Sequence, residues 1–221
     1  MIAKDLMIDS IPLVKTSDTG NTALAWMEMH KVSHLPIVNN EEFLGLISDS
    51  DIFSNESSDG PLGNYNLSFA RPYVFENQHI FEVIDIVAKL GITVIPVLDR
   101  NKHYLGSIPL YNLVSAFSKM ISVEKAGSII ILEMTIHDYS ASEIANIIES
   151  NNAKILSMYI STSDNSTKIY VTLKIDTTDL TPIIQTFNRY DYKIKASFLN
   201  EDMLKVFYSD RYDSFIKFLN I

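Results

Sequence analysis

The chain of 221 residues contains no cysteine, which excludes a disulfide framework, a cysteine-ligated zinc site and a thiol nucleophile. No apolar run approaches the roughly 18 residues that a membrane helix needs. Acidic residues interrupt the N-terminal stretch MIAKDLMIDS, where a secretory signal would need an unbroken apolar core. The sequence therefore predicts a cytoplasmic protein that does not enter a membrane.

Basic residues are also few, since 18 Lys and Arg stand against 27 Asp and Glu, and the formal net charge is −9. Such a chain repels the phosphate backbone of nucleic acid, and its lysines and arginines are scattered rather than gathered in one stripe. The five histidines show no metal-ligand spacing. We therefore expect no nucleic-acid partner and no metal site.

The first half of the chain repeats itself at an offset of 60 positions, with residues 32–38 lying over residues 92–98. After an insertion of one residue, the agreement continues with 44–47 over 105–108. A repeat of this period cannot bury its own core, so neighbouring copies must stack. The cleft between the copies is the first place to look for a ligand.

Each copy has the predicted order strand, helix, strand, strand, helix. Repeat one covers about 1–55 and repeat two about 68–120, within a first domain of 1–122. The expected elements of repeat one are a strand at 11–14, a helix through residues 23–32, strands at 35–38 and 43–47, and a short helix from residue 48. Those of repeat two lie at 72–74, 80–90, 94–98, 104–108 and 111–120. The polar stretch 54–64 between them is predicted to be a surface linker, with a lid over the cleft as the alternative.

The texture changes after residue 127, and residues 128–200 follow the order βαββαβ, which is typical of a ferredoxin-like fold. Strands are expected at 128–134, 155–160, 168–175 and 194–199, and helices at 142–150 and 180–190. A C-terminal helical tail is expected within 201–221, with an apolar face that packs on the protein itself or binds a partner. The predicted fold class is α+β.

Residues 45–51 read Gly-Leu-Ile-Ser-Asp-Ser-Asp, a strand that ends in a hydroxyl and leads into a helix with acids in its first turn. Helix N-termini favour anions, and Ser48 can add a hydroxyl donor. The carboxylate of Asp51 can accept hydrogen bonds from two vicinal hydroxyls, as acids do when they bind a ribose. Ser and Asp are also the preferred capping residues of helices. The pattern alone therefore fits either a nucleotide site or a structural cap.

Both repeats resemble the CBS domain, a module that occurs in pairs and binds adenosine-containing ligands. The resemblance covers about 1–120 and rests on the hydrophobic-Pro-hydrophobic strands at 35–38 and 95–97, the turn that follows, and the Gly-x-x-Ser-x-x-Asp segment. It implies that Asp51 binds the ribose, that Ser48 contacts the phosphate or ribose, and that backbone near Leu13 meets the adenine edge. The implied nucleotide-binding residues are Leu13, Val14, Ser33, His34, Leu35, Pro36, Ser48 and Asp51.

The second copy departs from this pattern, because Pro109 stands where the hydroxyl would be and Asn112 where the ribose-binding acid would be. Proline has no hydroxyl and no N–H, and an amide is not a carboxylate. Thr93 and Val94 replace Ser33 and His34. We therefore expect one competent cleft and one degenerate cleft, formed by Thr93, Val94 and Asn112. His34 itself has the alternative of a structural residue with satisfied hydrogen bonds.

The C-terminal unit resembles an ACT domain, a regulatory module that often binds amino acids at a dimer interface. The family's amino-acid sites usually have a glycine in the loop between the first strand and the first helix, and the loop 137–142 has none. A dimerising or partner-contacting role fits at least as well. The whole chain is similar to bacterial acetoin-utilisation CBS proteins, and CBS pairs of this kind commonly form homodimers.

These observations predict a non-enzymatic regulatory protein with no catalytic residues and no required cofactor. Its ligand would be AMP, ADP or ATP, with S-adenosylmethionine or a cyclic dinucleotide also open, and it would pass its state to a partner or a second subunit. The alternative is a ligand-free structural interaction module. A hydrolase that uses Asp49 and Asp51 lacks a nucleophile and an oxyanion stabiliser.

Overall fold

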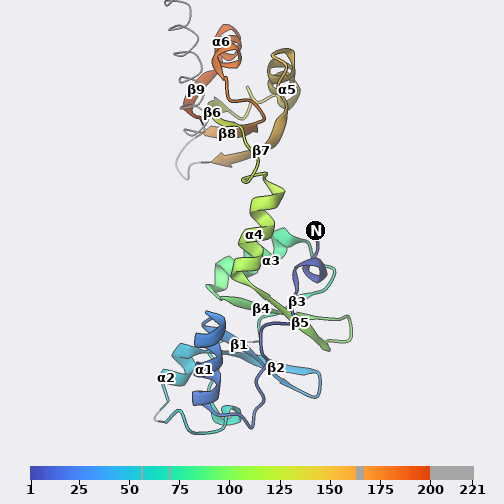
Figure 1. Ribbon diagram of the computed structural model, residues 1–221, viewed down its shortest axis with the longest axis vertical. Coiled ribbons are helices and arrows are strands. Elements are labelled where there is room, and N and C mark those ends of the chain that lie inside the picture. The colour runs from blue at the N-terminus through green and yellow to red at the C-terminus, as the bar shows by residue number, and fades with distance from the viewer. Residues whose placement is uncertain (56, 70, 163–166, 200–221) are drawn as a thin grey trace, which may run out of the picture. The chain divides into compact units, whose positions relative to one another are not determined.

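The computed structural model describes residues 1–55, 57–69, 71–162 and 167–199. The chain divides into two compact units, Met1–Phe117 and Ser118–Ile221. The first combines helices with a two-stranded and a three-stranded sheet, and the second combines helices with one four-stranded sheet (Figure 1). The expected C-terminal tail at 201–221 lies outside the described residues. Within the described ranges, every helix is too short or too polar to cross a membrane.

Repeat one follows the predicted order except at its first strand. The expected strand at 11–14 is reduced to one parallel bridge between Val14 and Ile37. The helix begins where the Thr19 side chain accepts a hydrogen bond from the Thr22 N–H, and it ends at Lys31, which has the left-handed φ of 55°. The elements are α1 (Gly20–His30), β1 (His34–Asn39), β2 (Glu42–Ser48) and α2 (Asp49–Phe53).

Repeat two matches its prediction more closely, because α3 and β4 begin and end at the predicted residues. Its short first strand pairs in parallel with β4, which pairs antiparallel with the last strand. The α3 helix ends at Gly91, whose φ of 65° suits a residue without a side chain. The elements are β3 (Val74–Phe75), α3 (Ile80–Leu90), β4 (Val94–Leu98), β5 (Tyr104–Pro109) and α4 (Leu110–Met120).

The two repeats share one hydrophobic core, and the segment that precedes each repeat packs on the other repeat. Val94 of repeat two is fully buried and packs in the same cluster as Leu35 and Ile47 of repeat one. The N-terminal segment, with the 3-10 helix η1 (Ala3–Leu6), forms bridges to repeat two through Ile2 and Ile8, and Figure 1 shows the N-terminus beside β3 and α3. In the same way, the linker that precedes repeat two packs on repeat one.

That linker contains the short 3-10 helix η2 (Leu62–Asn64) and then runs without regular structure through residues 65–69. It passes so close to β2 that a side chain at Gly45 would overlap the side chain of Leu67. At the start of the irregular run, the Tyr65 hydroxyl donates a hydrogen bond to the backbone carbonyl of Ser57. Each repeat is therefore completed by the segment that precedes the other one.

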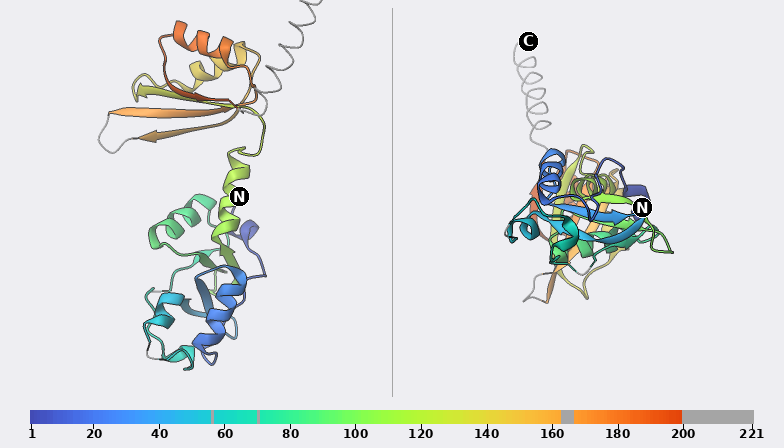
Figure 2. Two further views of the ribbon diagram at one scale, coloured as in Figure 1. Left: turned by 60° about the vertical axis from the view of Figure 1, so that its left-hand side comes forward. Right: turned by 90° about the horizontal axis from the view of Figure 1, so that it is seen from below.

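The second unit has a four-stranded sheet of order β7-β8-β6-β9, in which all neighbours are antiparallel. Two helices lie on one face of this sheet (Figure 2). The prediction of a ferredoxin-like unit is confirmed, because this is the strand order of the βαββαβ motif. The elements are β6 (Ser128–Thr135), α5 (Ala141–Ser150), β7 (Ile155–Thr162), β8 (Lys168–Ile175), α6 (Thr181–Arg189) and β9 (Lys193–Phe198).

The interior of the second unit follows from the alternation of its central strands. On β6, Ile130 and Leu132 are fully buried and face the helices, while Ile129 and Ile131 between them are partly exposed. Phe187 of α6 is also fully buried in this core. A buried side chain of this size stabilises the fold by roughly 1.5–3 kcal/mol.

The entry into β6 depends on a glycine. Gly127 has a φ of 142°, and a Cβ there would overlap the backbone carbonyl oxygen of Ile175. Gly127→Ala should therefore lower the free energy of unfolding of the second unit by roughly 1–3 kcal/mol or more, through backbone strain and displacement of β8. Urea unfolding followed by circular dichroism measures this.

Gly60→Ala is the matched control, because nothing lies within 4 Å of a Cβ at that position and its φ is not left-handed. Equal stabilities of the two variants would contradict this account of Gly127.

Candidate functional site

The polar residues at the end of β2 form a reciprocal cap on α2. The Ser48 hydroxyl accepts a hydrogen bond of 3.0 Å from the Asp51 N–H, and the Asp51 carboxylate accepts one of 2.9 Å from the Ser48 N–H. This is a capping box on a helix of five residues. The capping interpretation of this pair is therefore confirmed, and its nucleotide-binding role stays a prediction.

The other carboxylate oxygen of Asp51 is bonded to the linker. Its Oδ1 accepts a hydrogen bond of 3.1 Å from the Ser68 N–H and a second one from the Ser68 hydroxyl. Asp51 is only 2% exposed, whereas Ser68 lies at the surface. Ser68 therefore covers the carboxylate and supplies two of the donors that a buried charge needs.

These donors determine the ionisation of Asp51. Burial acts to raise the pKa of this carboxyl, but the hydrogen bonds from Ser68 and Ser48 together outweigh burial and hold the pKa below its ordinary value. The carboxylate is therefore ionised at neutral pH and acts as an acceptor only.

Three polar residues connect the two repeats next to this cap. The Thr93 hydroxyl oxygen accepts a hydrogen bond of 2.9 Å from the Ser33 N–H and lies 3.0 Å from Nδ1 of His34. The Thr93 N–H also points at Nδ1, at 3.3 Å, which makes Nδ1 the acceptor. Ser33, His34 and Thr93 thus form one network across the junction between β1 and β4.

His34 is a neutral imidazole in this setting. Burial lowers its pKa, and the nearby charges of Asp49 and Asp51 raise it by less, so the net pKa lies below the ordinary value. The ring also contacts Phe69 of the linker, with 5.6 Å between the ring centroids. Its Nδ1 is thus engaged inside the protein, as the structural alternative for this histidine requires.

The structure brings four of the predicted site residues together at one end of the β1–β2 pair. His34 and Ser48 are register partners in the β1–β2 pair, and the Asp49 N–H donates to the Ser33 carbonyl. Ser33, His34, Ser48 and Asp51 therefore lie around one end of this hairpin.

Leu13 and Val14 belong to the segment that pairs with the other edge of β1. The Val14 N–H and carbonyl pair with Pro36 and Val38, along the edge of β1 opposite to β2, and Leu13 is 40% exposed. Leu35 and Pro36 are buried within the strand. The adenine contact of the backbone near Leu13 and Val14 and the nucleotide-binding roles of Leu35 and Pro36 stay predictions. The linker is the segment that the structure places at Asp51.

The second copy uses the same positions for structural bonds. Asn112 donates from its amide to the carbonyl of Leu6 at 3.3 Å, and the Ile8 N–H donates to the carbonyl of Ser107. Val94 is fully buried in the shared core. Of the residues predicted for the degenerate cleft, Asn112 thus holds the N-terminal segment, Val94 fills the interior and Thr93 bonds to repeat one.

The sequence analysis missed Ser68 and Phe69, the two linker residues at the candidate site. At the repeat offset of 60, Ser68 corresponds to Ile8. Ser68 precedes repeat two but contacts repeat one, whereas Ile8 precedes the helix and strands of repeat one but contacts repeat two. One sequence signal could have pointed to Ser68, because the corresponding position in the other copy is the apolar Ile8. Which repeat each preceding segment packs on is a long-range contact, and local sequence patterns do not predict such contacts.

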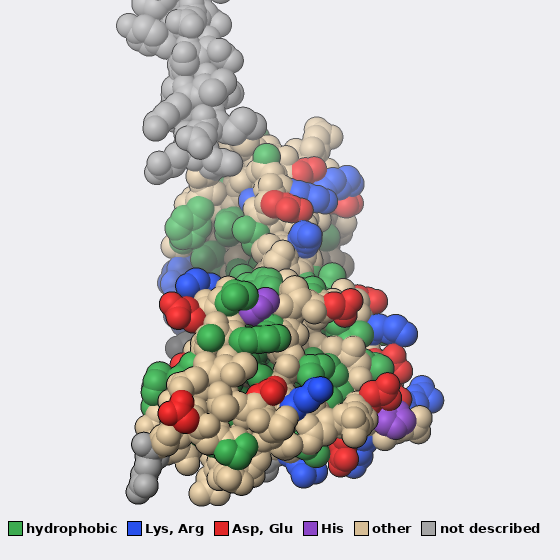
Figure 3. All heavy atoms as spheres, turned by 60° about the horizontal axis from the view of Figure 1, so that its bottom comes forward, with side chains coloured by type: hydrophobic (Ala, Val, Ile, Leu, Met, Phe, Trp, Pro, Cys, Tyr) green, Lys and Arg blue, Asp and Glu red, His purple; other side chains and the backbone are tan. Residues whose placement is uncertain are grey.

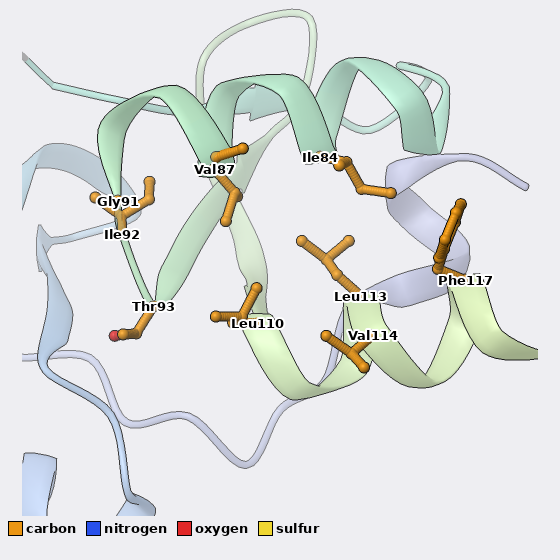
Figure 4. A pocket seen from close by; sticks show the side chains of 10 residues that line it. Ile84, Val87, Gly91, Ile92, Thr93, Leu110, Leu113, Val114 and Phe117 are labelled. Atoms are coloured by element: carbon orange, nitrogen blue, oxygen red, sulfur yellow. The ribbon is translucent and has the colours of Figure 1, made fainter. Parts of the chain in front are cut away.

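The helices of the two repeats carry corresponding hollows of different chemistry, each of about 380 Å³. In repeat two, Ile84 and Val87 of α3 face Leu113 and Val114 of α4, and Phe117 closes one end (Figure 4). The hollow in repeat one has charged residues where repeat two has apolar or small ones. These pairs are Glu28 and Ala88, Lys31 and Gly91, and Asp49 and Leu110.

Charges of both signs are interspersed on the face of the N-terminal unit that Figure 3 shows. Hydrophobic side chains lie singly or in small groups between them on this face. This distribution agrees with the scattered lysines and arginines of the sequence.

Comparison with known proteins identifies the two repeats. The family model of the CBS domain matches residues 3–57 and 70–119. A CBS domain pair/ACT domain protein from Thermotoga maritima has 19% identity and a TM-score of 0.49, over 54% of this chain and 98% of that one. A Vibrio cholerae protein assigned to acetoin utilization has 21% identity and a TM-score of 0.48, over 56% and 95%. The protein CBSX2, solved in complex with AMP, has 20% identity and a TM-score of 0.46, over 53% and 96%.

The hydrogen bonds of Asp51 predict a pH-dependent contribution to stability. Because its folded pKa lies below the unfolded reference of 3.8, the ionised carboxylate stabilises the fold at higher pH. This contribution is lost as the pH falls below about that reference and through the folded pKa. Asp51→Asn should therefore be clearly less stable than the parent at pH 7, and the difference should shrink toward pH 3.

Urea unfolding of both proteins between pH 7 and pH 3 measures this difference. Asp49→Asn on the same helix controls for the loss of one negative charge. A difference that stays constant over the whole pH range would show that ionisation of Asp51 does not stabilise the fold.

Proposed function

This chain is a CBS-domain protein, with its CBS domains at residues 3–57 and 70–119, and we propose that it is a non-enzymatic sensor of an adenosine nucleotide. CBS domain pairs are commonly regulatory modules rather than catalysts. The ligand would be AMP, ADP or ATP, with S-adenosylmethionine or a cyclic dinucleotide as further candidates. CBSX2 was solved with AMP.

The observation that supports this proposal most is the chemistry at Asp51. A buried, ionised carboxylate lies beside the junction of the two repeats, and its Oδ1 accepts two hydrogen bonds from a single surface residue, Ser68. Two donors on one carboxylate is also the arrangement by which an acid binds a ribose. Asn112 at the corresponding position holds backbone instead, so we propose one nucleotide site per chain.

Around the ribose, Ser48 and the Ser33–His34 pair are the proposed contacts for the rest of the nucleotide. They lie at the same end of the β1–β2 hairpin as Asp51. Because His34 is neutral and its Nδ1 accepts from the Thr93 N–H, it would donate a hydrogen bond from Nε2 rather than pair with a phosphate as a cation. Phosphate charge would thus need compensation from other groups.

The sensor would act by differential affinity, since a ligand shifts an equilibrium only as far as it binds one arrangement better. We propose that the ferredoxin-like second unit is an ACT-like domain that passes the state of the first unit to a second subunit or an unidentified partner. The protein would act in the cytoplasm.

A ligand-free scaffold is the second candidate, and one observation favours it. Both carboxylate oxygens of Asp51 already accept hydrogen bonds from the protein itself. A purely structural role would therefore leave no unsatisfied charge. Ligand titration separates the two functions.

The nucleotide proposal predicts that AMP, ADP or ATP raises the melting temperature of the protein, because a ligand that binds the folded state stabilises it. Asp51→Ala should remove the shift, whereas Asp49→Asn on the same helix should keep it. Isothermal titration calorimetry gives the affinity for each ligand.

Unchanged melting with all the adenosine ligands named above would contradict the sensor and favour the scaffold. Nucleotide turnover that disappears in Asp49→Asn would instead support the hydrolase.

We further propose that the protein is a homodimer joined through the apolar hollow of repeat two. Val114 and Tyr111 are 61% and 52% exposed beside it. Apolar surface of this kind marks interaction sites. A two-fold contact of this face with itself would bury apolar groups, whereas the corresponding face of repeat one would bring Glu28, Lys31 and Asp49 into the contact.

Val114→Asp should therefore dissociate the dimer by placing a charge in the contact. Phe53→Asp is the matched control, because Phe53 occupies the corresponding exposed position in repeat one. Sedimentation velocity should show a dimer for the parent and for Phe53→Asp, and a monomer for Val114→Asp. A monomeric parent, or dissociation only by Phe53→Asp, would contradict this interface.

A further inference from the structure

Ser68 presents two hydrogen-bond donors to Asp51, as a ribose would. Its N–H and its hydroxyl both donate to Oδ1 of the carboxylate. A ribose would donate from its two vicinal hydroxyls. Because Asp51 is 2% exposed and Ser68 lies over it, a ribose and Ser68 compete for the same acceptor.

Beyond these hydrogen bonds, residues 67–69 of the linker contact repeat one through the side chains of Leu67 and Phe69. Residues 65–69 belong to no strand or helix. Leu67 packs against the open side of Gly45, and Phe69 contacts the His34 ring. Side chains thus supply the described contacts between residues 67–69 and repeat one, apart from the Ser68 N–H.

The corresponding segment of the other copy is attached differently. There Ile8 forms a backbone bridge with Ser107, and the amide of Asn112 binds the backbone carbonyl of Leu6. In both of these attachments the acceptor is a backbone carbonyl. In the first copy the acceptor is instead the ionised Asp51 carboxylate, and an incoming diol can replace both Ser68 donors without leaving that carboxylate unsatisfied.

We propose that Ser68 is an internal competitor for the nucleotide, so that the ligand must displace residues 67–69 from Asp51 in order to bind. This inference rests on the proposed function and concerns the affinity of the same site. Ser68 is thus an affinity-determining residue of the site although it belongs to the linker.

Displacement would also link the site to the rest of the first unit. The same linker carries Tyr65, whose hydroxyl packs closely against Gly20 at the start of α1. A Cβ at Gly20 would lie only 2.7 Å from that hydroxyl. Toward its other end, the chain enters β3 of repeat two. Release of Ser68 would therefore loosen a segment that connects the first helix of repeat one with the sheet of repeat two.

The test is nucleotide affinity in Ser68→Ala, measured by calorimetry on the full chain with AMP, ADP and ATP. Removal of a hydrogen bond to a charged acceptor weakens the competitor, so the alanine variant should bind about tenfold more tightly. Ser68→Thr keeps a hydroxyl and should bind like the parent. Asn66→Ala is the matched control, because Asn66 is an exposed residue of the same segment.

A second readout follows the linker itself. Hydrogen exchange of a peptide that contains the Ser68 amide should become faster when nucleotide binds, because that N–H leaves Asp51. Melting curves without nucleotide verify that each variant is folded.

Weaker or unchanged binding by Ser68→Ala, or slower exchange at Ser68 on binding, would overturn the competitor role. If, in that case, the parent still binds a nucleotide and Asp51→Ala does not, the proposed function stands without the competitor role of Ser68. If neither protein binds a nucleotide, both proposals fail.

Discussion

A carboxylate that is withdrawn from water must keep hydrogen-bond donors around it, and this constraint organises the first unit around Asp51. Ser48 supplies a donor from the end of β2, and Ser68 supplies two from the linker. The capping box turns the chain from β2 into α2, and the linker bonds hold the approach to repeat two over repeat one. A single acidic side chain thus connects local structure, the path of the linker and the proposed ligand chemistry.

The internal repeat gives the unit matching scaffolds with different chemistry. The exchanged segments occupy related places, but the first copy attaches its segment to a carboxylate and the second attaches it to an amide and to backbone. The helical faces differ in the same sense, since one hollow is apolar and the other carries charges. This divergence explains why a duplicated fold is proposed to have one ligand site and one preferred contact face.

Periodicity predicted most of the elements, because buried strands and amphipathic helices leave local signals. The helix at 80–90 and the strands at 94–98 and 168–175 have the predicted bounds. The strand expected at 11–14 is a single bridge, since a short apolar run does not reveal how many partners it has. Ser48 and Asp51 were found from their spacing, whereas Ser68 was not, because its contact with Asp51 depends on the exchange of segments between the repeats.

The account rests on the claim that Asp51 exchanges Ser68 for a ribose. A crystal structure of the full chain grown with saturating AMP tests it most directly. The account predicts both ribose hydroxyls within hydrogen-bond distance of the Asp51 carboxylate, with Ser68 moved away from it. AMP bound elsewhere on the chain, with the hydrogen bonds between Ser68 and Asp51 intact, would contradict it.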